Sequence, residues 1–179
     1  MRFRLADVDR LLAPGYTGDL GSMTMGDLRA KRNECQTVEV ELSYLRRMAH
    51  GRLDVVYFDL TRRSEGRGAA GLTDIVSNLS EILSTRIYAP DSGRLAAMLA
   101  PDLDEVTLEE MDSVAGADRL HMLPELSDEE VQAVADRLTA LETEVSDKRR
   151  RLHDVIDRLH QEIVRRYRSG EATVESLLP

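Results

Sequence analysis

Two long stretches of this 179-residue chain lack proline and repeat apolar residues at alternating steps of three and four. The first covers residues 25–63 and the second covers residues 127–168. This spacing places an apolar seam along one side of a helix, so each stretch is predicted to form one helix of roughly 60 Å. A helix of that length in so small a chain needs a partner along its side. We therefore predict an all-α fold in which the two helices pair as an antiparallel coiled coil.

The segments around these stretches are shorter and richer in turn residues. The sequence SEGRGAAG at 64–71 predicts a flexible break, and LTDIVSNLSEILS at 72–84 predicts a short amphipathic helix that packs on the pair. Residues 85–126 contain three prolines and predict one or two short helices. Ser127 and Glu130 have the spacing of a capping box at the start of the second long helix. Residues 1–179 are interpreted as one helical domain.

Composition and charge narrow the class of protein. Aromatic residues make up only 4% of the chain, which argues against a β-sandwich or barrel. The net charge of −9 argues against nonspecific binding to nucleic acid, so we expect no direct contact with DNA. The single cysteine, Cys35, fits a reducing compartment, and no apolar run is long enough to span a membrane. We expect a cytoplasmic protein that does not contact a membrane.

An internal repeat links the two long stretches. A shift of 103 positions aligns residues 39–54 with residues 142–157, and seven of the sixteen aligned residues are identical. A repeated coiled-coil seam would keep its apolar residues, whereas here the apolar residues vary and polar ones are kept. At 100° per residue, five of them point into one stripe about 80° wide beside the seam. We call these stripes the polar rows: Glu39, Ser43, Arg46, His50 and Asp54 in the first helix, and Glu142, Ser146, Arg149, His153 and Asp157 in the second.

The residue types of the rows indicate the chemistry of a ligand. In an antiparallel pair a local two-fold axis relates the rows, so together they suit a two-fold symmetric ligand. Arginine binds guanine or phosphate through its planar fork, and a carboxylate accepts from the N–H edge of guanine. Serine and histidine donate to phosphate oxygens. These requirements together predict cyclic di-GMP.

Each row resembles the signature E-x3-S-x2-R-x3-Q-x3-D of the RsiG-type anti-sigma factors of actinobacteria, and residues 34–56 are similar to that family's first long helix. The resemblance implies that a cyclic di-GMP dimer, two molecules per chain, is held by the residues of both rows. It also implies that the loaded protein sequesters a WhiG-type sigma factor, which controls sporulation genes. His50 and His153 stand where the signature has glutamine. A neutral histidine replaces one amide hydrogen bond, and its charge depends on pH.

Three other interpretations of the rows remain open. The first is a structural coiled-coil adaptor without a ligand, in which arginines pair with carboxylates across the seam; it leaves the repeated serine and histidine without a role. The second is a metal site at the pairs His50/Asp54 and His153/Asp157, which the neighbouring arginines oppose. The third is an enzyme, but the sequence has no phosphate-binding glycine loop, nucleophile elbow or CxxC motif. We therefore expect no catalytic activity.

Charge is distributed unevenly along the chain. Residues 101–126 carry eight acids against Arg119 alone, whereas residues 146–168 carry eight bases against four acids. An acidic segment of this kind can cover the basic DNA- or polymerase-binding surfaces of a sigma factor. The same shift of 103 positions also places Arg62 and Arg63 on Arg165 and Arg166.

Overall fold

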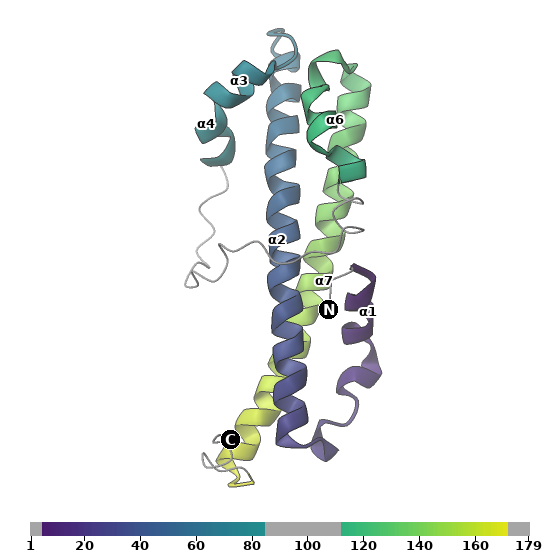
Figure 1. Ribbon diagram of the computed structural model, residues 1–179, viewed down its shortest axis with the longest axis vertical. Coiled ribbons are helices and arrows are strands. Elements are labelled where there is room, and N and C mark those ends of the chain that lie inside the picture. The colour runs from purple at the N-terminus through teal and green to yellow at the C-terminus, as the bar shows by residue number, and fades with distance from the viewer. Residues whose placement is uncertain (1–4, 85–111, 172–179) are drawn as a thin grey trace.

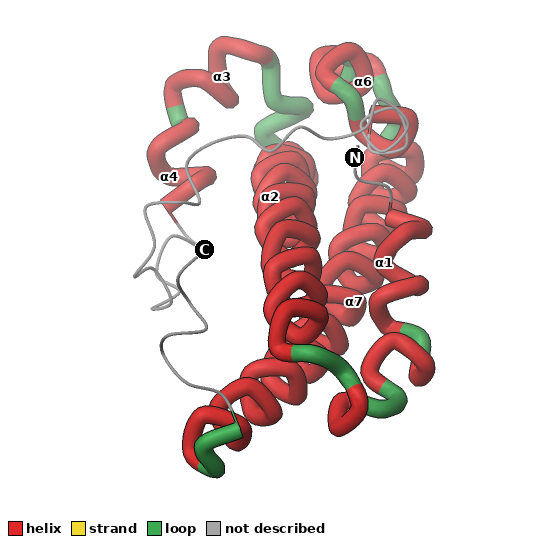
Figure 2. The backbone as a smooth tube through the Cα atoms, turned by 60° about the horizontal axis from the view of Figure 1, so that its bottom comes forward, coloured by secondary structure: helices red, strands yellow, loops and turns green. Residues whose placement is uncertain are grey.

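The computed structural model describes residues 5–84 and 112–171, which form helices and loops without any strand (Figure 2). Helix α2 (Met25–Ser64) and helix α7 (Asp128–Arg168) lie side by side and run in opposite directions (Figure 1). This arrangement confirms the predicted all-α fold and the antiparallel pair, with each helix boundary within one residue of its prediction. In the described part of the chain, no helix is long and apolar enough to cross a membrane.

Short helices surround the pair. Helix α1 (Leu5–Leu12) is followed by the 3-10 turns η1 (Pro14–Thr17) and η2 (Leu20–Ser22), and α6 (Ala117–His121) is followed by the 3-10 turn η4 (Leu123–Glu125). Helix α1 contacts α7, and α6 contacts α2. Figure 1 shows α3 (Leu72–Ser77) and α4 (Leu79–Ser84) beside α2, on the side away from α6. In the described part of 85–126, residues 112–115 are also helical and are followed by α6 and η4, and residues 85–111 lie outside the described residues.

The segment predicted as one helix at 72–84 is two short helices. The break falls at Asn78, whose side-chain Nδ2 donates to the carbonyl of Asp74 at 2.7 Å. The backbone N–H of Asn78 donates to the same carbonyl at 3.1 Å. An asparagine side chain that competes for backbone carbonyls favours helix ends over helix interiors, which explains why the helix does not continue.

The apolar seam between α2 and α7 forms the centre of the core. Its buried residues belong to two hydrophobic clusters. One cluster also includes Val8 and Leu11 of α1, and the other also includes Ala115 and Leu123. Every predicted seam position is buried except Val38 and Leu141, which are half-buried. The buried seam residues are Leu28, Cys35, Leu42, Leu45, Ala49 and Val56 in α2, and Val131, Val134, Leu138, Val145, Leu152, Val155 and Leu159 in α7.

The internal repeat extends beyond the rows to the start of each long helix. A 3-10 turn precedes both helices, and the shift of 103 positions takes η2 onto η4. The predicted capping box at Ser127 is present, with the Glu130 N–H donating to Ser127 Oγ at 3.3 Å. An equivalent box starts α2, where the Asp27 N–H donates to Thr24 Oγ1 at 3.1 Å. The two helices therefore begin in the same way.

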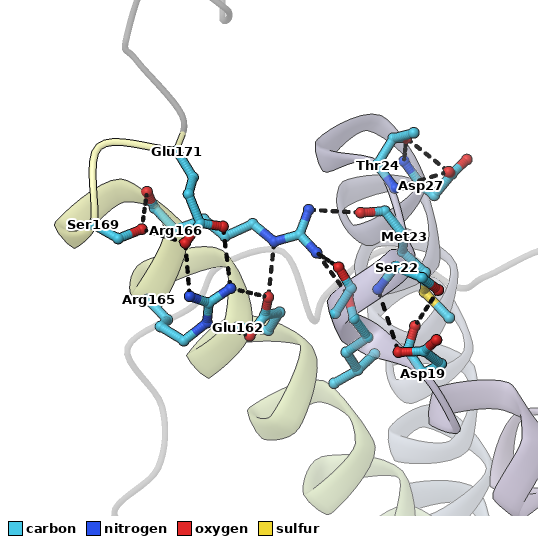
Figure 3. A network of polar contacts seen from close by, with 12 residues as sticks. Asp19, Ser22, Met23, Thr24, Asp27, Glu162, Arg165, Arg166, Ser169 and Glu171 are labelled. Atoms are coloured by element: carbon cyan, nitrogen blue, oxygen red, sulfur yellow. Dashed lines mark hydrogen bonds and ion pairs between the residues drawn. The ribbon is translucent and has the colours of Figure 1, made fainter.

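The repeat also extends to the end of each long helix. Arg166, near the end of α7, donates through Nη2 to the Leu20 carbonyl at 2.7 Å and through Nη1 to the Met23 carbonyl at 2.6 Å (Figure 3). Glu162, four residues earlier, accepts from Arg166 Nε at 2.8 Å. The arginine thus ties the end of α7 to the turn that leads into α2.

Arg63 does the same at the other end of the molecule. It donates through Nη2 to the Leu123 carbonyl at 2.7 Å and through Nη1 to the Leu126 carbonyl at 2.8 Å, while Asp59 accepts from its Nε at 2.7 Å. The shift of 103 positions takes each of these residues onto its counterpart around Arg166. We call Arg63 and Arg166 the end clamps. The chain therefore consists of two halves related by an approximate two-fold axis.

Candidate functional site

The polar rows lie on one side of the α2–α7 pair, at the middle of its length. Helix α1 and the residues before α6 approach from the other side of the seam, where Asp9 of α1 accepts from Lys148 Nζ at 2.6 Å and Asp112 accepts from Arg52 Nη2 at 2.5 Å. The rows are accessible to solvent, with the Glu39 side chain 19% exposed and the His153 side chain 45% exposed. A ligand can therefore reach them without displacing α1 or α6.

The first half of the site centres on Glu39. Ser43 Oγ donates to Glu39 Oε1 at 2.7 Å, and Arg149 Nε reaches across the seam to Glu39 Oε1 at 2.9 Å and to Ser43 Oγ at 2.8 Å. His153 Nε2 lies 3.5 Å from Glu39 Oε1. Burial alone raises the pKa of Glu39, but the hydrogen bonds from Ser43 and Arg149 outweigh it and lower the pKa. Glu39 is thus held as a carboxylate.

The second half centres on Glu142 and repeats the serine and histidine contacts with the helices exchanged. Ser146 Oγ donates to Glu142 Oε1 at 2.7 Å, and His50 Nε2 lies 2.7 Å from the same oxygen. Burial raises the pKa of Glu142, while hydrogen bonds from His50 and Ser146 and the charge of Arg46 lower it below its ordinary value. The two-fold relation between the rows is therefore approximate in the contacts: Arg149 is the close partner of Glu39 across the seam, and His50 is the close partner of Glu142.

Eight of the ten predicted site residues gather around Glu39 and Glu142, and the two aspartates flank them. Asp54 is half-buried and Asp157 is exposed, each one helical turn beyond the histidine of its row. The aspartates therefore lie at the outer ends of the rows.

The structure bears on two other interpretations of the rows, the structural adaptor and the metal site. Ser43, Ser146 and His50 all take part in the network between the rows. The expectation that interhelical pairing leaves serine and histidine without a role is therefore wrong. Among the residues that the structure describes, no three His, Cys, Asp or Glu side chains gather as a metal-binding group.

The donor and acceptor groups of the rows fit a guanine nucleotide. The two glutamates are ionised acceptors that suit the N–H edge of guanine, and the serines and arginines beside them suit phosphate oxygens or guanine O6 and N7. The ten row residues contain four carboxylates and two guanidinium groups. Arg47 and Arg150, which the repeat also keeps, are exposed next to the rows, and Arg150 Nη2 donates to Asp147 Oδ1 at 2.6 Å.

The comparison with protein families covers both rows and both end clamps. A family model described as RsiG-like matches residues 14–83 and 117–179, which is most of the chain. No curated protein matches the chain significantly. The family match confirms the resemblance indicated by the polar rows. The sequence signal for the end clamps was the alignment of Arg62 and Arg63 with Arg165 and Arg166, but it did not reveal their partners.

Proposed function

This chain belongs to the RsiG-like family of anti-sigma factors, and from that premise we propose that it binds two cyclic di-GMP molecules between its polar rows. In that state it sequesters a WhiG-type sigma factor and represses sporulation genes. The observation that carries the proposal is the reciprocal contact of Glu39 and Glu142 with the opposite row. A symmetric guanine dinucleotide meets the same groups in both halves. The proposed activity is regulatory binding in the cytoplasm, without catalysis or direct contact with DNA.

The size of the site favours two ligand molecules over one. Glu39 and His50 are eleven residues apart on α2, and His50 contacts Glu142, so the two Glu-centred clusters lie about 16 Å apart along the pair. One cyclic di-GMP molecule carries two guanines and two negative charges. A stacked pair carries four guanines, which gives a guanine to each glutamate and each arginine of the rows.

Ligand binding in this scheme is an exchange of partners. Arg149 leaves Glu39 and Ser43 and turns toward the ligand, and the N–H edge of a guanine takes its place at the carboxylate. The groups to be exchanged are partly exposed side chains, with Arg149 25% exposed. The Arg149–Glu39 pair is half-buried, so the hydrogen bonds that the guanines and phosphates form have to replace its contacts as it breaks.

A second candidate function is a structural adaptor that takes no ligand. The observation in its favour is that the rows already satisfy one another across the seam. Under that function the network fixes the register of α2 against α7, as buried polar residues do in coiled coils. Cyclic di-GMP then has no effect on the protein.

Isothermal titration calorimetry of the full chain with cyclic di-GMP tests the proposal. We expect two molecules bound per chain, and one per chain would contradict the dimer. Ligand held at 100 times its dissociation constant should add about 2.7 kcal/mol to the free energy of unfolding, whereas an adaptor would show no shift. Capture of the sigma factor should require the ligand, and equal capture without ligand would refute ligand gating.

A further inference from the structure

The symmetry of the rows raises the question of how an asymmetric protein is oriented on them. A two-fold symmetric ligand site presents the same groups when it is turned end for end. A sigma factor that touched only the rows and the ligand would therefore have two equivalent ways to dock. The residues that flank the rows determine whether one orientation is preferred.

The two flanks are related by the shift of 103 positions but differ in charge. His160 and Tyr57 lie five helical turns after Glu142 and Glu39, so they continue the direction of the rows. The lower flank, at the bottom of Figure 1, consists of Arg29, Arg32, His160 and Arg168, and the upper flank consists of the equivalent residues Gln132, Ala135, Tyr57 and Glu65. The lower flank thus holds three arginines where the upper flank holds none.

The contacts of the two flanks also differ. Arg29 Nη2 donates to Tyr167 Oη, which joins the start of α2 to the end of α7. Arg32 Nη2 donates to Asn33 Oδ1 at 3.3 Å, so that guanidinium faces no carboxylate in this contact. At the upper flank, Tyr57 Oη lies 3.3 Å from Thr139 Oγ1, a contact between two neutral groups. The lower flank is therefore cationic, and the upper flank is neutral at the equivalent position.

The lower flank is also hollowed. A hollow of about 610 Å³ lies along the last turns of α7 and is lined by His160, Gln161, Val164, Arg165, Arg168 and Ser169. Its wall combines the apolar Val164 with His160 and Arg168, while Arg165 is paired with Glu162 and Glu171 (Figure 3). A hollow of this kind accepts a side chain from a partner whose neighbours carry carboxylates.

We propose that the lower flank is the docking surface for an acidic segment of the sigma factor and fixes its orientation across the symmetric ligand site. The inference rests on the proposed function, because the sigma factor is the partner to be oriented. Arginine binds carboxylates through its planar fork, and opposite charges at an interface set orientation more than total affinity. Although the chain carries a net charge of −9, this flank is locally basic, so it selects an acidic segment.

Charge reversal at the flanks tests the proposal. The full-length Arg29→Glu/Arg168→Glu variant, loaded with cyclic di-GMP, should bind the WhiG-type sigma factor at least about tenfold more weakly at low salt, with unchanged affinity for the ligand. Gln132→Glu is the matched control, because it gives the upper flank glutamates at the two equivalent positions. It should change sigma binding less than about twofold. Arg168→Glu alone is the second variant. It changes an exposed residue and keeps the contact of Arg29 with Tyr167, so it tests the surface even if the double variant does not fold.

The outcomes of these measurements distinguish a failure of the proposed function from a failure of the docking surface. Wild-type protein that binds no cyclic di-GMP would refute the proposed function. Intact ligand binding with unchanged sigma binding in both lower-flank variants would overturn the docking surface. Equal losses in the lower-flank variant and in Gln132→Glu would also overturn it, because the effect would then be general repulsion.

Site-specific crosslinking reads the orientation directly. A photo-reactive residue at position 161 should capture an acidic peptide of the sigma factor, and one at the equivalent position 58 should capture a different peptide. The same peptide from both positions would contradict a fixed orientation. Crosslinks from position 161 to a second copy of this chain would assign the flank to self-association and overturn the proposal.

Discussion

The arginines at the centre of the helix pair and those at its ends differ in what they bind. Arg166 is 7% exposed and donates to the backbone carbonyls of Leu20, Gly21 and Met23. Arg149 is 25% exposed and donates to a side-chain carboxylate and a hydroxyl. A carbonyl of a fixed turn cannot move away from its donor, whereas a side chain can rotate. The end clamps therefore hold the two long helices together, and the side chains of the polar rows can exchange their contacts for contacts with a ligand.

The 3-10 turns explain why the ends need arginine. Each turn precedes a long helix, and the carbonyls of Leu20 and Leu123 accept one long backbone bond within it, from the N–H of Met23 at 3.4 Å and of Leu126 at 3.2 Å, which leaves room for a second donor. A guanidinium group reaches several carbonyls at once because its five N–H donors spread in a plane. Arg63 satisfies the turn at η4 in the same way that Arg166 satisfies the turn at η2. The repeat therefore keeps both end clamps for a structural reason.

The largest expected effect on stability comes from removing an end clamp. Arg166→Ala leaves the carbonyls at η2 without their donor and Glu162 without one of its partners, so it should lower the free energy of unfolding by about 3–5 kcal/mol. Urea denaturation monitored by circular dichroism measures this loss. Arg165→Ala is the control, since Arg165 is exposed and should matter little. A loss in Arg166→Ala no larger than in Arg165→Ala would contradict the distinction between centre and ends.

Removing an arginine of the polar rows should have the opposite effect, with ligand binding lost and stability kept. Arg46→Ala and Arg149→Ala should each abolish ligand binding and ligand-dependent capture of the sigma factor while the helices remain intact. A bidentate contact with guanine contributes about 1–3 kcal/mol, and losses compound when the second ligand binds only where the first is held. Linkage then removes the partner affinity that the ligand had supplied.

The two-fold relation makes this prediction sharper, because both arginines should be about equally important for ligand binding. Calorimetry measures binding, and circular dichroism measures helicity. Loss of helicity in either variant would favour the structural adaptor. A harmless Arg149→Ala would show that the second row does not bind the ligand.

The fold could be predicted from the sequence where periodicity determines it. The spacing of apolar residues identified the seam and both long helices, and the repeat identified the face that carries the rows. The break at Asn78 and the capping box at Thr24 depend on single side-chain hydrogen bonds, to which a periodic pattern is insensitive. The end clamps were hidden because their partners are backbone carbonyls far away in the sequence.

The site could be predicted as a set of residues but not as a set of contacts. Helical geometry places Glu39 and Ser43 on one face, and it does so without reference to the other helix. Which residue lies opposite Glu39 depends on how far α7 is shifted along α2. That shift is set by packing of the seam, so the contact from Arg149 to both Glu39 and Ser43 emerged only in the structure.

As the pH is lowered, the ion pairs of the polar rows should be lost before those of the end clamp at Arg166. Hydrogen bonds lower the pKa of Glu39 and of Glu142, so their contribution to stability is present above the ordinary glutamate range and is lost as pH falls through their lowered pKa values. Hydrogen bonds from Arg165 and Arg166 lower the pKa of Glu162 further, to about 2. The rows should therefore lose their ion pairs at a higher pH than the clamp at Arg166. Carboxyl NMR titration of these three glutamates measures the order, and titration of Glu162 first would contradict it.

The smallest effect is expected from replacing the row histidines by the glutamine of the family signature. In His50→Gln/His153→Gln an amide N–H can keep the hydrogen bond that each imidazole directs at a glutamate. The affinity for cyclic di-GMP should therefore change less than about threefold. Isothermal titration calorimetry compares the two proteins.

The contacts of the two histidines say what each outcome means. His50 Nε2 and His153 Nε2 each approach one glutamate oxygen, and the amide of glutamine can donate to the same oxygen. A loss of affinity larger than about tenfold in the double variant would therefore mean that the imidazole rings make a contact with the ligand that an amide does not reproduce. An unchanged affinity would give His50 and His153 the same role that glutamine has in the family signature.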